Sequence, residues 1–172
     1  MSDDLKKSIR EIQDFPKEGI LFYDVTTLLK DKSAFQKAID SLAELVKDRQ
    51  IDTVVSVESR GFIFGAALAY RLGAGFVPVR KKGKLPAQTI EASYCLEYGT
   101  DCLQMHQDAL KPSSKVLIVD DLLATGGTAS AVCRMVAQLK AEVTAIVFLI
   151  ELCGLKGREK LRDFDVYSLL KY

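Results

Sequence analysis

The 172-residue sequence has no tryptophan, one histidine and four cysteines, and no two cysteines form a Cys-x-x-Cys pair. A zinc site would have few thiol or imidazole ligands, so we expect reduced cysteines in a cytoplasmic protein. No apolar run approaches the roughly 18 residues that a membrane span requires, and the first residues lack the pattern of a secretory signal. These absences disfavour a zinc-stabilised domain, a membrane protein and a secreted protein.

An excess of charge of one sign is also missing, because 24 basic residues stand against 23 acidic ones. This balance disfavours a surface devoted to nucleic acid. Hydrophobic residues make up 48% of the chain, which excludes a disordered or fibrous protein. Internal repeats, low-complexity segments and linkers are absent, so we expect residues 1–172 to form one domain.

Strand and helix patterns alternate along the chain. Apolar, β-branched runs predict strands at residues 51–57, 75–79, 116–119, 143–150 and 166–170, the last at a sheet edge. Apolar residues three or four apart predict helices over Leu5–Ile12 with Ser2 as cap, Phe35–Val46 with Ser33 as cap, and Val132–Leu139; a further apolar helix ends at Gly73. The alternation predicts an α/β fold, with a mainly parallel twisted sheet flanked by helices.

Two regions depart from this alternation. Pro16 and Gly19 break the first helical pattern, and an extended apolar segment follows them. From Ile90 to Tyr98 the apolar period becomes two, and residues 102–105 are expected to pair back as a hairpin. We therefore expect a small N-terminal hood, about residues 1–32, and an antiparallel flexible flap, about residues 82–105.

The stretch VLIVDDLLATGGT, at residues 116–128, organises the rest of the chain. A buried strand leads to Asp120 and Asp121, a loop of small residues follows, and a helix begins behind the loop. Gly126 and Gly127 allow backbone N–H groups to approach an anion, and the helix N-terminus adds partial positive charge. Carboxylates repel phosphate but accept hydrogen bonds from a sugar diol. The ordered set predicts a ribose 5-phosphate site, whereas an isolated Gly-Gly would favour an ordinary turn.

Two common nucleotide signatures are missing from this stretch. It has neither Gly-x-x-x-x-Gly-Lys-Ser/Thr nor Gly-x-Gly-x-x-Gly, which disfavours a nucleoside triphosphate loop and a dinucleotide site. Its apolar residues, adjacent acidic residues and Thr-Gly-Gly-Thr loop instead resemble the phosphoribosyl diphosphate signature of the type I phosphoribosyltransferases.

Ribosyl transfer from a 1-pyrophosphate requires cations to neutralise the departing pyrophosphate. Arg60, at a predicted strand-to-helix turn, is the strongest candidate, because its planar fork matches phosphate oxygens. Arg80, Lys81 and Lys84 belong to a basic run that a solvated face would also explain.

The incoming nitrogen must also lose a proton, for which Glu91, Glu97 and His106 are the candidates. A carboxylate on a mobile flap can be desolvated on closure, which raises its pKa. Periodicity alone does not choose between the two glutamates, and a single histidine without an evident partner is more often a packing or surface residue.

Beyond the signature, nearly the whole chain resembles the adenine phosphoribosyltransferases. The matching segments are FPKEGILFYD at 15–24, ESRGF at 58–62, RKKGKLP at 80–86, ASYCLEYG at 92–99, EL at 151–152 and LKGR at 155–158. The resemblance implies the type I phosphoribosyltransferase fold, a homodimer, and Mg²⁺ held through the sugar pyrophosphate and water rather than by protein ligands. It also implies the reaction: adenine and 5-phosphoribosyl 1-pyrophosphate give AMP and pyrophosphate, in purine salvage.

For the base, the resemblance implies that Phe22 stacks on adenine while backbone groups of Leu21 and Tyr23 read its polar edge. Tyr23 departs from the Arg common in vertebrate-type members, which matters little for a backbone role. Glu97 would be the acid/base on the flap, and Tyr98 would close over the site.

For the sugar pyrophosphate, the resemblance implies that Arg60 binds pyrophosphate beside a strained Glu58–Ser59 peptide, in trans or cis form. Arg80 and Lys84 would contribute to substrate binding, and the segment at Arg80 would reach towards a neighbouring subunit's site. The ribose hydroxyls and the 5-phosphate would be held by Asp120, Asp121, Ala124, Thr125, Gly126, Gly127 and Thr128.

Two other functions remain open at this point. Hypoxanthine and guanine enzymes typically have an acidic residue in the phosphate loop, where this chain has Ala124 and Thr125. A nucleotide sensor or transcription regulator would usually add a DNA-binding domain or a basic face. Both alternatives are disfavoured, and substrate tests distinguish them.

Overall fold

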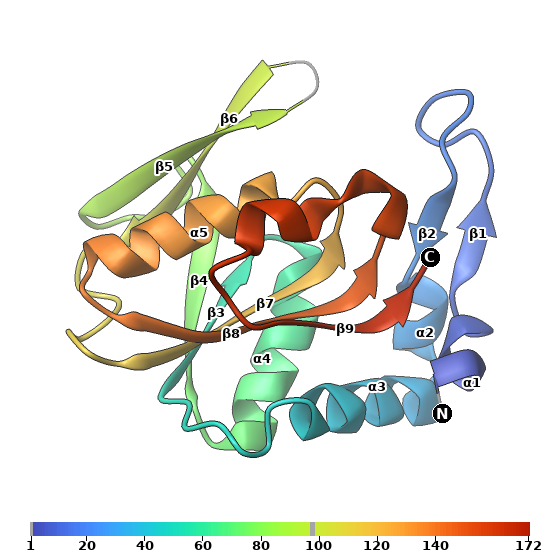
Figure 1. The fold of residues 1–172 in the computed structure, drawn as a ribbon, viewed down its shortest axis with the longest axis horizontal. Coiled ribbons are helices and arrows are strands. Elements are labelled where there is room, and N and C mark those ends of the chain that lie inside the picture. Colours follow the sequence, from blue (N-terminus) through green and yellow to red (C-terminus); the bar gives the residue numbers. More distant parts are fainter. Residues whose placement is uncertain (1, 97–98) are drawn as a thin grey trace.

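The computed structural model describes residues 2–96 and 99–172, and within them seven strands form one sheet. Its order is β5-β6-β4-β3-β7-β8-β9 (Figure 1). The strands are β3 (Thr53–Val57), β4 (Gly75–Lys81), β5 (Thr89–Leu96), β6 (Gly99–His106), β7 (Lys115–Leu123), β8 (Glu142–Glu151) and β9 (Val166–Lys171). Strands β4, β3, β7, β8 and β9 run parallel to one another. Strand β6 is antiparallel to both of its neighbours, β4 and β5. The predicted mainly parallel sheet, with β9 at its edge, is confirmed.

Helices cover both faces of the sheet. Two of them, α3 (Lys32–Glu44) and α4 (Arg60–Leu72), pack on one face, and α5 (Gly127–Gln138) packs on the other (Figure 1). Along β7, Leu117 contributes to the first core cluster and Ile118 to the second. Successive residues of β7 point to opposite faces of the sheet, and both faces are buried. The strand therefore has a continuous apolar sequence instead of alternating apolar and polar residues.

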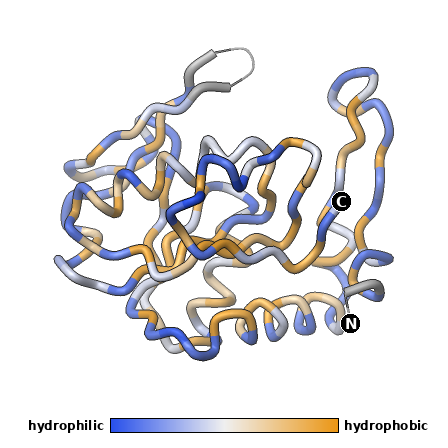
Figure 2. Tube along the Cα trace, viewed as in Figure 1, coloured by the Kyte–Doolittle hydropathy of each residue, from blue (hydrophilic) through white to orange (hydrophobic). Residues whose placement is uncertain are grey.

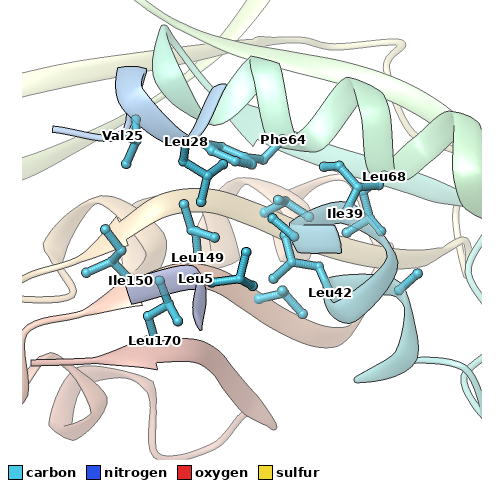
Figure 3. Close-up of a cluster of buried hydrophobic side chains, with 14 of the residues drawn as sticks. Leu5, Val25, Leu28, Ile39, Leu42, Phe64, Leu68, Leu149, Ile150 and Leu170 are labelled. Atoms are coloured by element: carbon cyan, nitrogen blue, oxygen red, sulfur yellow. The ribbon is translucent and has the colours of Figure 1, made fainter. Parts of the chain in front are cut away.

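Figure 3 shows the cluster beneath α3 and α4, where Leu42, Phe64 and Leu68 meet Leu149 of β8. All four side chains are fully buried. Figure 2 shows the same separation of core from surface, with hydrophobic segments in the central strands and hydrophilic segments at the outer turns. Close packing on both faces fixes the positions at which the strands end.

The neighbouring parallel strands β3 and β7 lead into helices on opposite faces, α4 and α5 respectively. In open α/β sheets such a switch leaves a crevice beyond the carboxyl ends of the strands, where ligands bind. The fold therefore directs the search for a site to this edge.

The N-terminal part contains α1 (Ser2–Lys6), β1 (Arg10–Ile12), β2 (Phe22–Asp24) and α2 (Thr26–Lys30). The prediction of one helix through Ile12 is wrong, because residues 10–12 pair antiparallel with residues 22–24. Leu5 and Ile9 are both buried, so their spacing reflects a shared core rather than a continuous helix. Long-range strand pairing overrides the local helical pattern here.

Two other local predictions need correction. The cap of α3 is Asp31 rather than Ser33: its carboxylate accepts hydrogen bonds from the backbone N–H groups of Ser33 and Ala34, both at 2.9 Å. Strand β7 continues to Leu123, so Asp120 and Asp121 lie within its last residues rather than beyond it. By contrast, α4 ends before Gly73, which has a φ of 68°, as predicted.

The predicted hairpin is present as β5 and β6, which extend the main sheet through the pairs Arg80↔Gln104 and Lys81↔Leu103. Ile90 and Ala92 of β5 are buried, in agreement with the period-two pattern. No helix within residues 2–96 and 99–172 combines the length and apolarity needed to cross a bilayer.

Candidate active site

Two helix N-termini meet the carboxyl edge of the sheet, those of α4 after β3 and α5 after β7. Neither of their capping residues, Ser59 and Gly126, makes a side-chain hydrogen bond to the helix. The contrast is α3, whose first N–H groups are satisfied by Asp31. Uncapped N–H groups and the positive end of a helix dipole suit an anionic ligand.

The loop between β7 and α5, Ala124–Gly126, leads directly into the N-terminus of α5. Gly126 has a φ of 76°, a left-handed conformation that favours glycine. Thr125 is exposed, whereas Ala124, Gly127 and Thr128 are partly buried around the start of α5. The predicted 5-phosphate residues are thus contiguous at one helix N-terminus.

The adjacent carboxylates differ in their surroundings. Asp121 is 7% exposed, and its Oδ2 lies 2.8 Å from Nε of Arg60. Asp120 accepts a hydrogen bond from the Asp121 N–H at 2.9 Å. Burial of its carboxyl group, followed by the negative charge of Asp121, raises the pKa of Asp120 well above its usual range.

Gly61, the second residue of α4, lets this helix approach the acidic pair. A Cβ added to Gly61 would lie 2.6 Å from Oδ1 of Asp120 and 3.0 Å from Oγ of Ser56. Glycine is needed here because the start of α4 lies against the side chains of Asp120 on β7 and Ser56 on β3, a contact that the motif Glu-Ser-Arg-Gly-Phe did not reveal by itself.

Phe22, which is predicted to stack on adenine, lies beside Arg60, which is predicted to bind pyrophosphate. The guanidinium carbon of Arg60 is 5.4 Å from the ring centroid of Phe22, within the range of a cation–π contact. Phe15 packs edge-on against Phe22, with 5.0 Å between the ring centroids. Through Arg60, the hood strand β2 is therefore connected to Asp121 and the sheet edge.

The residues on either side of Phe22 have different exposures. Leu21 is 39% exposed, whereas Tyr23 is partly buried and packs on Tyr172, with 4.1 Å between their ring centroids. Burial, followed by the charge of Glu11, raises the pKa of Tyr23. The Tyr23 ring is thus part of the packing.

The Glu58–Ser59 peptide is cis, one of the two forms considered from the sequence. Glu58 accepts hydrogen bonds from the guanidinium of Arg80 and from the Lys81 N–H, at 2.9 and 2.7 Å. Burial opposes ionisation of Glu58, but these two donors outweigh it and lower its pKa. Arg80 also donates to the carbonyl oxygen of Lys84 at 3.3 Å, so these three predicted residues form one cluster.

Glu97 and Tyr98 lie outside the described residues. Of the other proton-transfer candidates, Glu91 accepts hydrogen bonds from Gln104 at 2.6 Å and Lys82 at 3.1 Å on the exposed side of the flap. Its carboxylate is held by these contacts, one with β6 and one with the segment between β4 and β5. Nε2 of His106 is buried and has no hydrogen-bond partner among the described residues.

The sequence did not predict the contacts that join β5 and β6 to the rest of the structure. Asp101 lies 3.1 Å from Nζ of Lys81 and accepts a hydrogen bond from the Tyr94 hydroxyl at 3.3 Å. Arg134 of α5 donates to the carbonyl oxygen of Ser93 at 2.7 Å. The flap is thereby fastened both to β4 and to the helix that follows the phosphate loop.

Protein ligands for a metal are sparse in this structure. Within residues 2–96 and 99–172, no three His, Cys, Asp or Glu side chains gather into a group able to hold a metal ion. The carboxylates of Asp120 and Asp121 offer oxygen donors at the sheet edge, which is the ligand type that Mg²⁺ prefers.

Comparison with known proteins gives the same assignment over nearly the whole chain. Residues 24–171 match the family model described as a phosphoribosyl transferase domain. The adenine phosphoribosyltransferase of Clostridium tetani is 60% identical over 169 residues, which cover 98% of each chain.

Solved structures agree with this match. The adenine phosphoribosyltransferase of Thermoanaerobacter pseudethanolicus is 53% identical, with a TM-score of 0.98 over all of both chains. The Saccharomyces cerevisiae enzyme, solved with adenine and an imino-altritol bisphosphate, is 44% identical, with a TM-score of 0.92 over 98% of this chain and 97% of the other. The chain belongs to the phosphoribosyltransferase family, and within that family to its adenine phosphoribosyltransferases.

Proposed function

We propose that the chain transfers the 5-phosphoribosyl group from 5-phosphoribosyl 1-pyrophosphate to adenine, giving AMP and pyrophosphate in purine salvage. The observation that supports this most is the connection of three predicted subsites, from Phe22 through Arg60 to Asp121. The adenine phosphoribosyltransferases that resemble the chain along its length support the same activity. Residues 1–172 would act as one catalytic unit.

At the sugar end, the 5-phosphate would bind the backbone N–H groups at Gly126 and Gly127 and the hydroxyls of Thr125 and Thr128. Ala124, at the start of this loop, has no side chain large enough to obstruct the anion. Asp120 and Asp121 would accept hydrogen bonds from the two ribose hydroxyls.

At the pyrophosphate, Arg60 would neutralise the charge that develops as the bond to ribose breaks. Backbone N–H groups at Glu58–Ser59 and the cations Arg80 and Lys84 would complete this subsite. Arg60 is already oriented by Asp121 at 2.8 Å, which lowers the entropy lost when it binds an anion.

At the base, adenine would stack on Phe22, with backbone groups of Leu21 and Tyr23 at its polar edge. Glu97 would remove the proton from the attacking nitrogen, and Tyr98 would exclude water when the flap closes.

Mg²⁺ would arrive with the sugar pyrophosphate and keep several of its waters, as this cation usually does. Asp120 and Asp121 fit a hydrated ion, because carboxylate oxygens accept hydrogen bonds from bound water. When bound, the ion would withdraw charge from the leaving pyrophosphate.

We also infer a homodimer formed through α4 and β4. Ile63, Tyr70 and Phe76 are 41%, 90% and 37% exposed, a large apolar area for a helix and an adjoining strand. Arg80 is the next-to-last residue of the same strand, so a second copy on this face would bring Arg80 near the neighbouring site. The free thiols of Cys102, Cys133 and Cys153 agree with a reducing, cytoplasmic location.

Product formation from adenine, hypoxanthine and guanine tests the activity. With Mg²⁺ and 5-phosphoribosyl 1-pyrophosphate, we expect AMP from adenine and little product from the 6-oxopurines. Preferential formation of IMP or GMP would replace the base assignment. Binding of the sugar pyrophosphate without any nucleotide product would indicate a sensor instead.

A further inference from the structure

The phosphate loop is supported from behind by a segment distant in sequence, at Gly157. A Cβ on Gly126 would lie 2.3 Å from the carbonyl oxygen of Gly157. A Cβ on Gly157 would lie 2.3 Å from the carbonyl oxygen of Ala124 and 3.1 Å from the Gly126 nitrogen. The two backbones are in direct contact, so the position of Gly157 determines how far the loop can retreat from a ligand.

Gly157 begins the 3-10 helix η2 (Gly157–Leu161), and the next residue, Arg158, holds it to the sheet. Nε and Nη2 of Arg158 each donate to a different carboxylate oxygen of Glu151, both at 2.7 Å. Nη1 donates to the carbonyl oxygen of Val166 at 2.7 Å, and Nη2 also lies 3.3 Å from Oγ of Ser168. A bidentate guanidinium–carboxylate pair fixes orientation as well as distance.

The other end of this pair is beside the start of the phosphate loop. Glu151 is the last residue of β8 and pairs across the sheet with Leu123, the residue before Ala124. The N–H of Leu152 donates to the carbonyl oxygen of Leu123 at 2.9 Å. The Glu151 side chain is only 7% exposed, and Arg158 lowers its pKa by hydrogen bonding.

We propose that Arg158 and Glu151 are positioning residues for the 5-phosphate subsite, acting through the backbone of Gly157. This rests on the proposed function, since it assigns the loop at Ala124–Gly126 to the sugar phosphate. The pair keeps Gly157 against the loop, so the N–H groups at the start of α5 are in place before the ligand binds. Neither side chain touches substrate.

A purely structural role for the pair would be attachment of β9 to β8. Arg49 provides a matched control for that role, because it joins the same region at a distance from the phosphate loop. It donates to Asp165 at 2.6 Å, to the Tyr167 hydroxyl at 2.8 Å and to the carbonyl oxygen of Thr144 at 3.3 Å.

The experiment measures the dissociation constant of ribose 5-phosphate by calorimetry, together with kcat and both KM values, for Arg158→Gln, Arg158→Lys and Arg49→Gln. For Arg158→Gln we expect about ten- to a hundredfold weaker binding of ribose 5-phosphate, because the N–H groups at the start of α5 would be misplaced. The KM for adenine should stay unchanged. Arg158→Lys should recover part of the affinity, and Arg49→Gln should lower the Tm without weakening ribose 5-phosphate binding.

Equal loss of Tm in Arg158→Gln and Arg49→Gln with unchanged affinity in both would overturn the proposal. If Arg158→Gln does not fold, Gly157→Ala replaces it, since its added Cβ would push directly on the loop. Unchanged ribose 5-phosphate affinity in that variant would also overturn the proposal. If the wild-type protein binds ribose 5-phosphate but forms no AMP, the proposed function is wrong. The role of Arg158 is still decided by the comparison of ribose 5-phosphate affinities.

Discussion

Asp120 and Asp121 are adjacent in sequence, yet their carboxyl groups are in different electrostatic states. Asp121 is paired with Arg60, while burial and the neighbouring charge raise the pKa of Asp120. A raised pKa means that ionised Asp120 destabilises the folded state, and a donor such as a ribose hydroxyl would relieve this cost. The residue is therefore better suited to binding than to stability.

At the same scale, replacement of Glu97 by Gln tests the proton-transfer assignment. We expect Glu97→Gln to lower kcat by about 10²–10⁴-fold, because an amide cannot accept the proton from the base. Binding of the sugar pyrophosphate, measured by calorimetry, should change little. Glu91→Gln is the matched control, because Glu91 lies on β5 and bonds to Gln104 and Lys82. Unchanged kcat in Glu97→Gln would remove this residue from the mechanism.

At the scale of elements, β1 and β2 are joined by a charge pair as well as by their ladder. Nε of Arg10 lies 3.0 Å from Oδ2 of Asp24, and the Thr26 N–H donates to Oδ1 at 2.9 Å. Hydrogen bonding from Arg10, then from Thr26, lowers the pKa of Asp24 to about 2. Asp24 thus stabilises the folded state fully above its unfolded pKa, near 3.8, and loses this effect as the pH falls towards 2.

Urea unfolding of wild type and Asp24→Asn across pH checks this effect. At pH 6 the variant should be less stable by roughly 1–2 kcal/mol, a range reduced for the solvent exposure of Arg10. The difference should shrink as the pH falls from about 4 to about 2, because wild-type Asp24 becomes protonated. A difference that stays constant over this range would show that the charge of Asp24 contributes nothing.

Elements with a strong local pattern could be predicted from the sequence, and long-range contacts could not. Residues 116–128 gave the strand, the loop and the start of α5 because apolar burial and glycine geometry are local properties. The pairing of β1 with β2, and the contact of Gly157 with Gly126, depend on segments that meet only in the fold. Arg158 and Glu151 lie in segments that match the family, but the sequence assigns no role to either residue for the same reason.

At the scale of the whole molecule, the apolar face of α4 and β4 predicts the oligomeric state. We expect wild-type protein to be a dimer by light scattering coupled to size-exclusion chromatography, and Tyr70→Arg to shift it towards monomer. A charge placed in a buried apolar interface is costly to desolvate. Leu155→Arg is the control, because Leu155 is also exposed but lies on η1 (Cys153–Leu155), away from this face. A monomeric wild type would contradict the proposed interface.

The family model begins at residue 24, so the strand that includes Phe22 lies almost entirely before the region shared across the family. In the proposed site, the residues for the donor sugar pyrophosphate and those for the acceptor base would therefore come from separable parts of the polypeptide. The residues proposed to bind the sugar belong to the common sheet, whereas Phe22, proposed to stack on the base, lies on a short segment before the matched range. Such a division allows evolution to exchange one acceptor for another while the machinery for the activated sugar stays intact.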